Sequence, residues 1–248
     1  ITEKKAYEKG LQIAKEKAEE ANKLKSNFLS NISHEIRTPL NGILGSTENI
    51  ILQRQNDPNL ISQLEIIQES SERLLSTINS ILDLSRIEAK KLEVLYKDSN
   101  INDLLATILL PLKGLAVRKG LLLSVKYETQ PLKGLIDQRY FEMIINNLVG
   151  NAIKYSEKGM ISVRLKGIED KIELSVSDQG IGMSEDFQKI LFNPFEQESK
   201  GNSRIYEGTG LGLAITKNLV DILGGSIDIK SVKEQGTKVV VILPLGKK

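Results

Sequence analysis

The sequence predicts a chain of two structural classes: an α-helical hairpin that forms a dimeric four-helix bundle, and a following α+β domain. Two observations predict this division. Before about residue 95 there is almost no glycine, and apolar side chains recur at helical heptad spacing. Beyond it, glycines cluster and valine-rich strands alternate with helical segments. Such a mixture is typical of helices packed on one face of a mixed sheet.

Composition excludes several kinds of chemistry. The 248 residues are 40% hydrophobic and 27% charged, which is typical of a folded chain with a real core. A net charge of +2 argues against a general nucleic-acid binder. The lack of cysteine and the single histidine exclude disulfides, thiolate catalysis and multi-histidine metal sites. No apolar run approaches the roughly 20 residues of a membrane span, so we expect a cytoplasmic chain. Membrane anchoring of a longer parent chain stays open.

The first 95 residues predict a linker and a helical hairpin. Residues 1–25 carry mostly small apolar side chains at heptad spacing, which predicts a thin coiled-coil linker. Within residues 26–95, two long amphipathic patterns flank a turn signal at 53–59, which predicts an antiparallel hairpin. A lone hairpin cannot cover its apolar seam, so we expect a homodimer. The alternative is packing against the rest of the chain.

Residues 96–248 are expected to form the second domain. Its first helix is expected to be bent or interrupted by Pro111. The stretch 179–210 is glycine-rich and is expected to be irregular with one short helix. We expect helices at about 101–119, 138–155 and 211–223, with strands at 121–127, 160–167, 171–178, 226–231 and 236–243.

The single histidine, His34, lies on the outward side of the first predicted helix. Glu35 follows it directly, and Arg37 and Thr38 share its face one turn later. An exposed imidazole beside a carboxylate can act as a nucleophile. Arg37 can meet anionic oxygens, and Thr38 can orient a water. We expect Pro39 to kink the helix rather than break it, because the apolar seam resumes beyond it. The alternative is an ordinary surface histidine.

Three polar side chains share one face of the predicted helix at 138–155. Asn147 and Asn151 are four residues apart, so their amides lie together, and Lys154 lies on the same side as Asn151. Amide oxygens suit Mg²⁺, which takes phosphate oxygens as further ligands. Lys154 can reach a phosphate. The alternative is a capping or packing role for the two asparagines.

A carboxylate and two glycines follow a predicted apolar strand. Asp178, fixed at the strand end, can accept a hydrogen bond from an exocyclic amine such as that of adenine. Gly180 and Gly182 allow close approach of a ligand to the backbone. The alternative is an ordinary tight turn.

A second glycine-rich segment leads into the predicted helix at 211–223. Its amides and the positive end of the helix dipole can bind phosphates. The preceding stretch, 196–207, contains Arg204 and is long and polar enough for a mobile lid over a ligand; a surface loop is the alternative. The segment consists of Gly208, Thr209, Gly210, Leu211 and Gly212.

Together these motifs resemble the sensor histidine kinases of two-component systems over nearly the whole chain. Each motif alone is modest, but their order is specific. The histidine motif resembles the family's phosphoacceptor motif, and the others resemble its asparagine, glycine and phenylalanine boxes. The matching segments are His34 to Pro39, Asn147 to Tyr155, Asp178 to Gly182, Phe192 to Glu196, Gly208 to Leu213, and Gly236 with Thr237. Tyr140 departs from the family, which often has arginine there.

The resemblance implies a dimerisation and histidine-phosphotransfer domain at 26–95 and an ATP-binding α/β sandwich of the Bergerat (GHKL) type at 96–248. By this resemblance His34 accepts the γ-phosphoryl group and Glu35 is the base. It also implies that the asparagines handle Mg²⁺ and phosphates and that Asp178 reads adenine. The remaining implied nucleotide-binding residues are Lys154, Tyr155, Gly180, Gly182, Arg204, Gly208, Thr209, Gly210, Leu211 and Gly212.

The resemblance further implies transfer to an aspartate of a response regulator receiver domain, and an upstream PAS-like sensor before the linker. A phosphatase activity toward that regulator, with Thr38 holding the water, is also expected. Two other classes share some of these features. A gyrase- or chaperone-type ATPase has no use for the His34 motif, and a signalling scaffold would bind nucleotide without catalysis.

Overall fold

The computed structural model describes residues 7, 12, 29, 32, 33, 35–53, 57–89, 93–198 and 208–246. The chain divides into two compact units, Ile1–Leu92 and Glu93–Lys248, slightly ahead of the expected boundary. Nearly all of the predicted coiled-coil linker lies outside the described residues, so it stays a prediction. None of the helices in the described ranges has the length and apolar character needed to cross a membrane.

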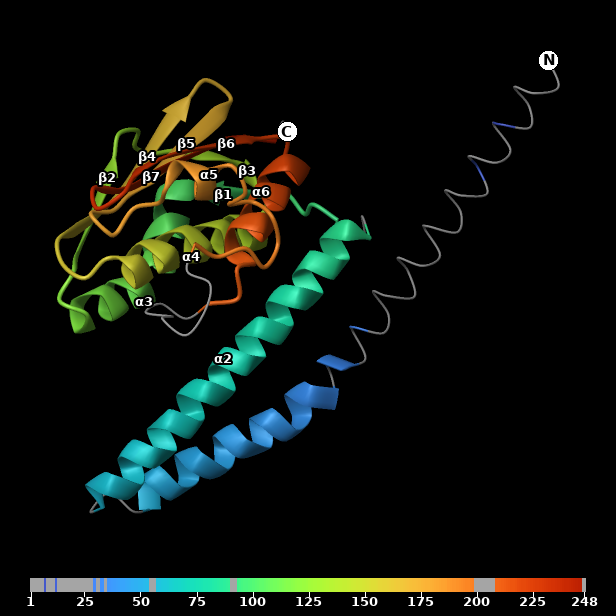
Figure 1. Cartoon of the computed structure of the whole chain (residues 1–248). Coiled ribbons are helices and arrows are strands. Elements are labelled where there is room, and N and C mark those ends of the chain that lie inside the picture. Colours follow the sequence, from blue (N-terminus) through green and yellow to red (C-terminus); the bar gives the residue numbers. More distant parts are fainter. Residues whose placement is uncertain are drawn as a thin grey trace. The chain divides into compact units, whose positions relative to one another are not determined.

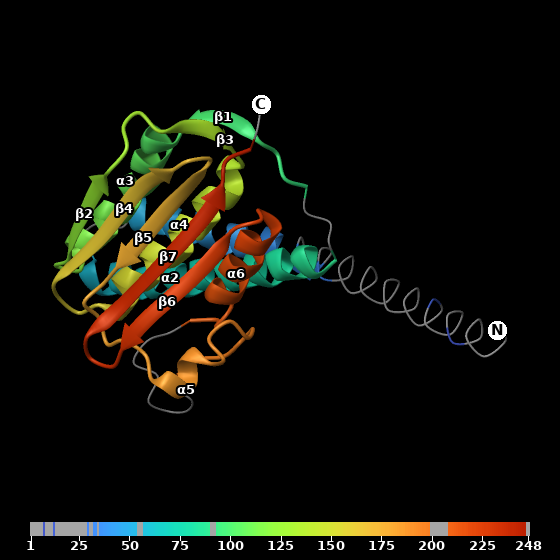
Figure 2. The same cartoon turned by 90° about the horizontal axis from the view of Figure 1, so that it is seen from above.

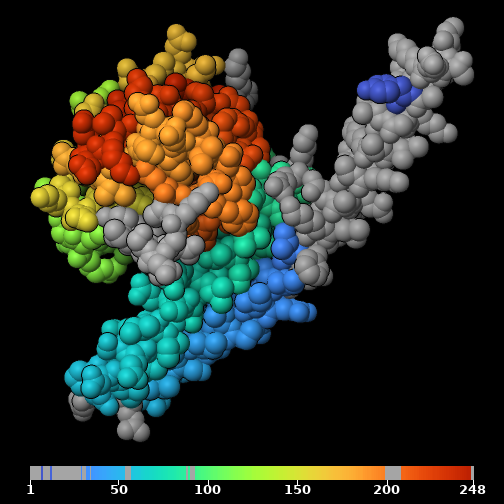
Figure 3. Space-filling view, in the orientation of Figure 1, coloured from blue at the N-terminus to red at the C-terminus, as the bar shows by residue number. Residues whose placement is uncertain are grey.

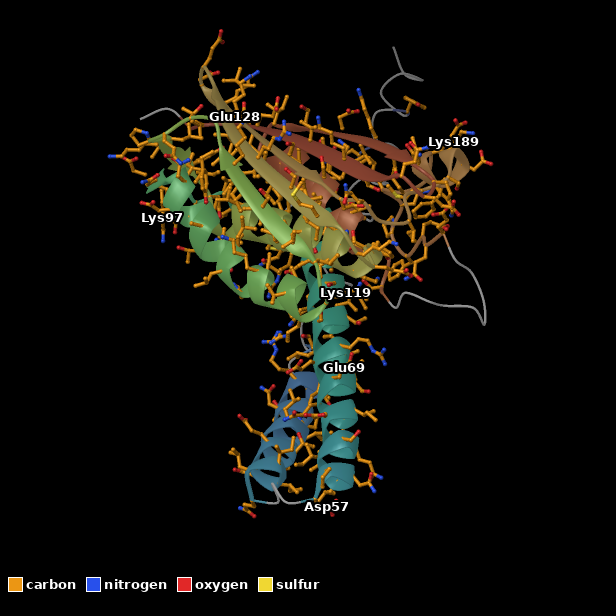
Figure 4. The ribbon with its side chains drawn as sticks, turned by 90° about the vertical axis from the view of Figure 1, so that its left-hand side faces the viewer. Asp57, Glu69, Lys97, Lys119, Glu128 and Lys189 are labelled. Atoms are coloured by element: carbon orange, nitrogen blue, oxygen red, sulfur yellow. The ribbon has the colours of Figure 1, made fainter. Side chains whose placement is uncertain are left out.

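The first unit contains the predicted pair of helices. One covers residues 35–53, and the other, α2, spans Pro58–Glu88 (Figure 1). Asp57, labelled at the start of α2 in Figure 4, caps that helix by accepting a 3.1 Å hydrogen bond from the Leu60 amide. Pro39 lies inside the first helix. The helix therefore continues past the proline, as the resumed seam predicts.

The two helices of this unit lie beside each other next to the turn (Figure 3) and diverge away from it (Figure 1). Leu40 and Leu64 are buried, whereas several apolar residues of the predicted seam are not. Ile67 is 43% exposed and Leu74 is 47% exposed, and Ile43 on the first helix is similarly open. A single hairpin therefore leaves part of its apolar surface uncovered.

The second unit contains a mixed five-stranded sheet with its long helices on one face (Figure 2). The strand order is β2-β4-β5-β7-β6; β2 and β4 are parallel and the other pairs are antiparallel. This confirms the predicted class. The elements are α3 (Ile101–Arg118), β2 (Leu122–Tyr127), α4 (Gln138–Tyr155), β4 (Met160–Ile168), β5 (Lys171–Ser177), α5 (Glu185–Gln188), α6 (Gly212–Ile222), β6 (Ser226–Val232) and β7 (Gly236–Pro244).

The core lies between α4 and the sheet. Along β4 and β5, alternate residues are buried toward the helices, as the period of a half-covered strand requires. The apolar stripe of α4 faces them and is almost completely buried. This core includes Phe141, Ile144, Ile145, Leu148, Ile161, Val163, Leu165, Ile172, Leu174 and Val241.

Two features differ from the prediction. The helix α3 runs uninterrupted through Pro111. Both Pro111 and Thr107 lie on its exposed side, so the carbonyl that loses its amide partner can be solvated. A small antiparallel pair, β1 (Lys97–Asn100) with β3 (Lys133–Ile136), was not predicted.

Candidate functional site

The helix α4 carries the predicted polar face. Asn147, Asn151 and Lys154 are all half-buried, so each packs on the domain and is still partly accessible. The opposite face of the helix belongs to the core. The fixed helix therefore sets the positions of the three polar side chains.

Both ends of α4 are anchored by side chains. At its start, buried Asp137 accepts hydrogen bonds from the amides of Arg139 (3.0 Å) and Tyr140 (3.3 Å). At its end, the Lys119 ammonium, labelled in Figure 4, donates to the carbonyls of Ile153 (2.8 Å) and Lys154 (2.6 Å). A cation at these terminal carbonyls also interacts favourably with the negative end of the helix dipole. Rigid ends hold the asparagines in place.

The asparagines of α4 face the first turn of α6. A Cβ atom on Gly212 would lie 3.4 Å from Asn147 Oδ1 and 4.0 Å from Asn151 Nδ2. Gly210, just before it, has a φ of +72°, and a Cβ there would lie 2.7 Å from the Phe195 carbonyl carbon. Glycine is therefore required for this segment to pass close to its neighbours. The amide groups of α4 and the glycine segment form one site.

The start of the glycine segment meets the end of α4. A Cβ on Gly208 would clash with the Lys154 ammonium, and the Gln197 side chain donates to the Gly208 carbonyl. Lys154 also donates a 2.9 Å hydrogen bond to the Tyr155 hydroxyl, and its ammonium lies 4.5 Å from the Tyr155 ring centroid. These contacts place a cation at the entrance of the glycine segment, where a phosphate can bind.

Within the segment itself, the Thr209 hydroxyl accepts a 3.3 Å hydrogen bond from the amide of Leu211, whose side chain is buried. The Phe195 amide donates a 3.1 Å bond to the Gly210 carbonyl. The predicted phenylalanine and second glycine boxes are therefore in contact.

Asp178 lies just beyond the end of β5. The amides of Gly180 (2.8 Å) and Thr237 (3.2 Å) both donate to its Oδ1 atom. Burial raises the pKa of the Asp178 carboxyl, and these two amides only partly offset it. Among the described residues, the backbone donors to this carboxylate reach Oδ1, which leaves Oδ2 for a ligand. A half-buried, oriented acceptor of this kind suits an amine donor.

The loop after Asp178 is tied to α4 and to β6. A Cβ on Gly180 would clash with the Tyr155 carbonyl, which accepts a 3.2 Å hydrogen bond from the Ile181 amide. Gly182 has a φ of +60°, and a Cβ there would clash with the Val232 carbonyl. The predicted adenine reader and the predicted phosphate-handling helix therefore share one rigid frame.

Two cavities flank this frame. One of about 460 Å³ adjoins Asp178 and Thr237 and is also lined by Ser231, Lys230 and Lys238. The other, of about 370 Å³, lies between α3 and α4 beside Lys154. Neither is lined by the asparagine face itself, so the convergence of the motifs, rather than cavity volume, defines the site.

Sequence reasoning missed Glu198, a residue near the start of the predicted lid at 196–207 that ties this segment to its surroundings. Glu198 accepts hydrogen bonds from the Ser184 amide (2.9 Å) and the Lys233 ammonium (2.8 Å). Burial opposes its charge, but these two donors outweigh burial and lower the pKa of the Glu198 carboxyl. A single Glu in a polar loop carries no sequence signal of this role. Arg204, predicted to contact nucleotide, lies outside the described residues.

The phosphoacceptor motif belongs to the first unit. Glu35 and Thr38 are exposed on the helix at 35–53, and His34 lies outside the described residues. Arg37 is half-buried and donates a 2.8 Å hydrogen bond from Nη2 to Asn79 Oδ1 on α2. Asn79 was not predicted; the only signal was a polar residue within the apolar pattern of that helix.

Metal binding was also predicted at the asparagines. In the parts of the chain that the structure describes, no group of three or more His, Cys, Asp or Glu side chains is arranged to hold a metal. Asn147 and Asn151 instead present two amide groups on one face, beside the glycine segment. This donor set fits a hard cation that takes its other ligands from water and phosphate.

Two family models match the chain. Residues 24–90 match the His Kinase A (phospho-acceptor) domain. Residues 136–247 match the histidine kinase-, DNA gyrase B- and HSP90-like ATPase. Each match lies within one of the two units of the structure.

Curated relatives match the chain across both units. The chain is 41% identical over 244 residues to the sensor protein GacS of Pseudomonas syringae pv. syringae, covering 96% of this chain and 27% of GacS. It is 38% identical over 233 residues to the signal transduction histidine-protein kinase BarA of Escherichia coli K12, covering 92% of this chain and 25% of BarA. The chain thus spans about a quarter of the length of these relatives.

Solved structures show the same arrangement of elements. Full-length ShkA in complex with AMPPNP matches with a TM-score of 0.74 and 28% identity, over 89% of this chain and 46% of ShkA. The Acinetobacter baumannii histidine kinase AdeS shares the fold, with a TM-score of 0.60 and 22% identity over 86% of this chain and 98% of AdeS. With a phospho-acceptor hairpin, a histidine kinase-like ATPase domain and these relatives, the chain belongs to the sensor histidine kinase family and comprises its catalytic core.

Proposed function

We propose that this chain transfers the γ-phosphoryl group of ATP to His34 and then to an aspartate of a response regulator receiver domain. One observation carries the proposal. The asparagine face of α4 meets the first turn of α6, and the end of α4 meets the loop of Asp178. One helix thereby fixes the distance between the residue proposed to bind adenine and the residues proposed to bind the phosphates.

The proposed nucleotide contacts follow from the donors and acceptors present. Asp178 Oδ2 accepts a hydrogen bond from the exocyclic amine of adenine, because Oδ1 already accepts from two backbone amides. The amides of the glycine segment 208–212 and the Lys154 ammonium bind phosphate oxygens. The solved complex of ShkA with AMPPNP, an ATP analogue, supports this use of the fold.

We assign a magnesium ion to the amide oxygens of Asn147 and Asn151. A bound Mg²⁺ offsets the charge of the phosphates and helps orient them. The chain's own contribution is the rigid α4, which holds both amides on the side where the phosphates lie. Because the metal takes most of its ligands from water and phosphate, it needs no carboxylate cluster.

The transfer to histidine uses two groups of this chain as nucleophile and base. An imidazole nitrogen of His34 forms a bond to the γ-phosphorus while the bond from that phosphorus to the bridging oxygen breaks, and the electron pair leaves on ADP. The proton on the other ring nitrogen passes to Glu35, the next residue. In the second reaction, the aspartate oxygen of the receiver domain replaces the histidine nitrogen on phosphorus.

The proposed partners follow from both units. Uncovered apolar residues on the hairpin, among them Ile43, Ile67 and Leu74, support pairing with a second copy into a four-helix bundle. A receiver domain is required as acceptor, and we assign a PAS-like sensor upstream of the linker at residues 1–25. Because ATP and the receiver domain are used together, we place this core in the cytoplasm. The net charge of +2 supports a protein without a nucleic-acid partner.

Labelling with γ-³²P-ATP tests the proposal. The parent chain should form an acid-labile, alkali-stable adduct, and His34→Gln should abolish it while ATP binding, measured by calorimetry, is retained. A gyrase- or chaperone-type ATPase would release phosphate without labelling, and a scaffold would bind ATP without either reaction. Label on the His34→Gln variant, or an unlabelled parent that binds ATP, would overturn the proposal.

A further inference from the structure

A hydrogen bond joins the two helices of the hairpin close to the phosphoacceptor motif. Arg37 Nη2 donates to Asn79 Oδ1 at 2.8 Å, and the two residues are 42 positions apart in the sequence. Both side chains are half-buried. The bond is therefore partly shielded from water and holds the guanidinium of a long, flexible side chain in one place.

Asn79 differs from its neighbours on α2 in the partner to which its side chain bonds. Thr77 and Ser80, on either side of it, donate 2.9 Å hydrogen bonds to carbonyls of their own helix, those of Arg73 and Ser76. Asparagine is an unfavourable residue in a helix interior. Its amide reaches the opposite helix instead of its own backbone, which points to a role for that contact.

The geometry gives Arg37 a second binding capacity. A guanidinium is planar and has five N–H donors in a rigid fork. One bond to Asn79 orients the plane and leaves most of the donors for other acceptors. In the sequence Arg37 comes three residues after His34, which is the spacing of residues that share a helical face. Anionic oxygens on phosphorus at His34 are the acceptors that this fork suits.

We infer that Asn79 is a positioning residue, which holds Arg37 so that its guanidinium binds the phosphoryl oxygens during transfer at His34. This inference rests on the proposed function. While the N–P bond forms and the bond to the bridging oxygen of ADP breaks, negative charge remains on the three outer oxygens of the phosphoryl group. A preorganised cation stabilises that charge better than one that must first be ordered.

The test uses single-turnover rate constants in the whole chain. The parent and its variants are labelled with γ-³²P-ATP under single-turnover conditions. The labelled proteins are then freed of nucleotide and mixed with ADP and Mg²⁺, and loss of label is followed. This first-order constant counts only phosphorylated molecules, so a smaller folded fraction does not change it. If Asn79 has only a structural role, its substitution therefore leaves the rate constant for loss of label unaltered.

We expect Arg37→Ala to lower the rate constant of labelling and the rate constant of label loss to ADP about ten- to a hundredfold each. This range corresponds to the loss of a hydrogen bond to a charged group. Asn79→Ala should lower them about two- to tenfold. Asn79→Asp, which keeps an oxygen acceptor of the same reach, should restore most of the rate. In the Arg37→Ala background, Asn79→Ala should have no further effect. Ser80→Ala, whose hydroxyl bonds only within its own helix among the described contacts, is the matched control.

Two outcomes would overturn the inference. Rate constants unchanged by Asn79→Ala, with a lowered melting temperature, would assign the residue to hairpin stability alone. Equal effects of Asn79→Ala in the parent and in the Arg37→Ala background would show that it does not act through Arg37. A parent chain that is not labelled at His34 instead refutes the proposed function, so the two failures are distinguishable.

Discussion

The backbone amide of Leu95 donates a 2.7 Å hydrogen bond to Oδ2 of buried Asp137, the residue that caps α4. The preceding Glu93 carbonyl accepts from the Tyr140 hydroxyl and from the Arg139 guanidinium, both at 3.1 Å. The chain that enters the second unit is therefore attached directly to the helix of the nucleotide site. Tyr140, which departs from the expected arginine, contributes its hydroxyl to this attachment.

Asp137→Asn should loosen this attachment. The ion pair with Arg139, 3.1 Å long, is lost, and the amide cannot accept as many hydrogen bonds as the carboxylate. We expect the free energy of unfolding of the second unit to fall by about 1.5–3 kcal/mol, the range for hydrogen bonds to a charged group. The Leu95 amide should also exchange its hydrogen faster. Asp170→Asn, at an exposed turn, is the control, and equal urea midpoints for both variants would contradict the prediction.

Stability should depend on pH through the same carboxyl. Burial opposes the charge of Asp137, but the Arg139 guanidinium and the amides of Leu95 and Tyr140 outweigh burial and lower the pKa of its carboxyl. A lowered folded-state pKa stabilises the fold above the unfolded value of about 4 and loses this effect as pH falls toward the folded pKa. We expect the parent to lose more stability below about pH 4 than Asp137→Asn does. Parallel pH curves from thermal melts would rule this out.

Asp178→Asn should separate binding from stability. The charged adenine acceptor is lost, so ATP affinity by calorimetry should fall roughly ten- to a hundredfold. Because burial raises the pKa of Asp178, its charged form is disfavoured in the folded state, and the neutral amide avoids that cost. The melting temperature should be unchanged or higher at neutral pH. Exposed Asp228→Asn should alter neither quantity; unaltered ATP affinity in Asp178→Asn would refute the assignment.

Asn151→Asp should impair autophosphorylation with Mg²⁺–ATP. The new carboxylate adds a negative charge where phosphates are proposed to bind, and two such charges about 4 Å apart repel by roughly 4 kcal/mol at an effective dielectric constant of 20. We expect the labelling rate at saturating Mg²⁺ to fall at least about tenfold. Asn146→Asp makes the same change on the exposed side of α4 and should label normally. Normal labelling of Asn151→Asp would remove the metal assignment.

Thr38→Ala should slow dephosphorylation of the regulator without changing the labelling of His34. Thr38 is exposed one turn after His34, and its hydroxyl can hold a water in line with the phosphorus of a docked aspartyl phosphate. It is uncharged and does not take the histidine proton. The assay follows a receiver domain that the chain itself has phosphorylated. Thr77→Ala on α2 is the control, and equal loss rates in Thr38→Ala and the parent would retire the idea.

Much of the fold follows from local patterns. The helix α4 and strands β4 to β7 lie within one or two residues of their predicted ranges, because each has a long apolar period bounded by glycine or polar turns. The strands β1 and β3 escaped prediction because four residues are too few to show a period. The predicted interruption at Pro111 was wrong, because on the exposed side of the helix the carbonyl that loses its amide partner can bond to water, whereas the alternative of a bend stays a prediction.

The sequence by itself determined which side chains share a helical face, such as Asn147 with Asn151, and where glycine permits a turn, as after Asp178. These properties depend only on residue spacing and backbone sterics. Tertiary structure alone decided which segments meet. Thr237 binds Asp178 across 59 residues, and Asn79 binds Arg37 across 42. Such contacts depend on strand order and on the pairing of helices, which bring distant segments together, and no local pattern records that pairing.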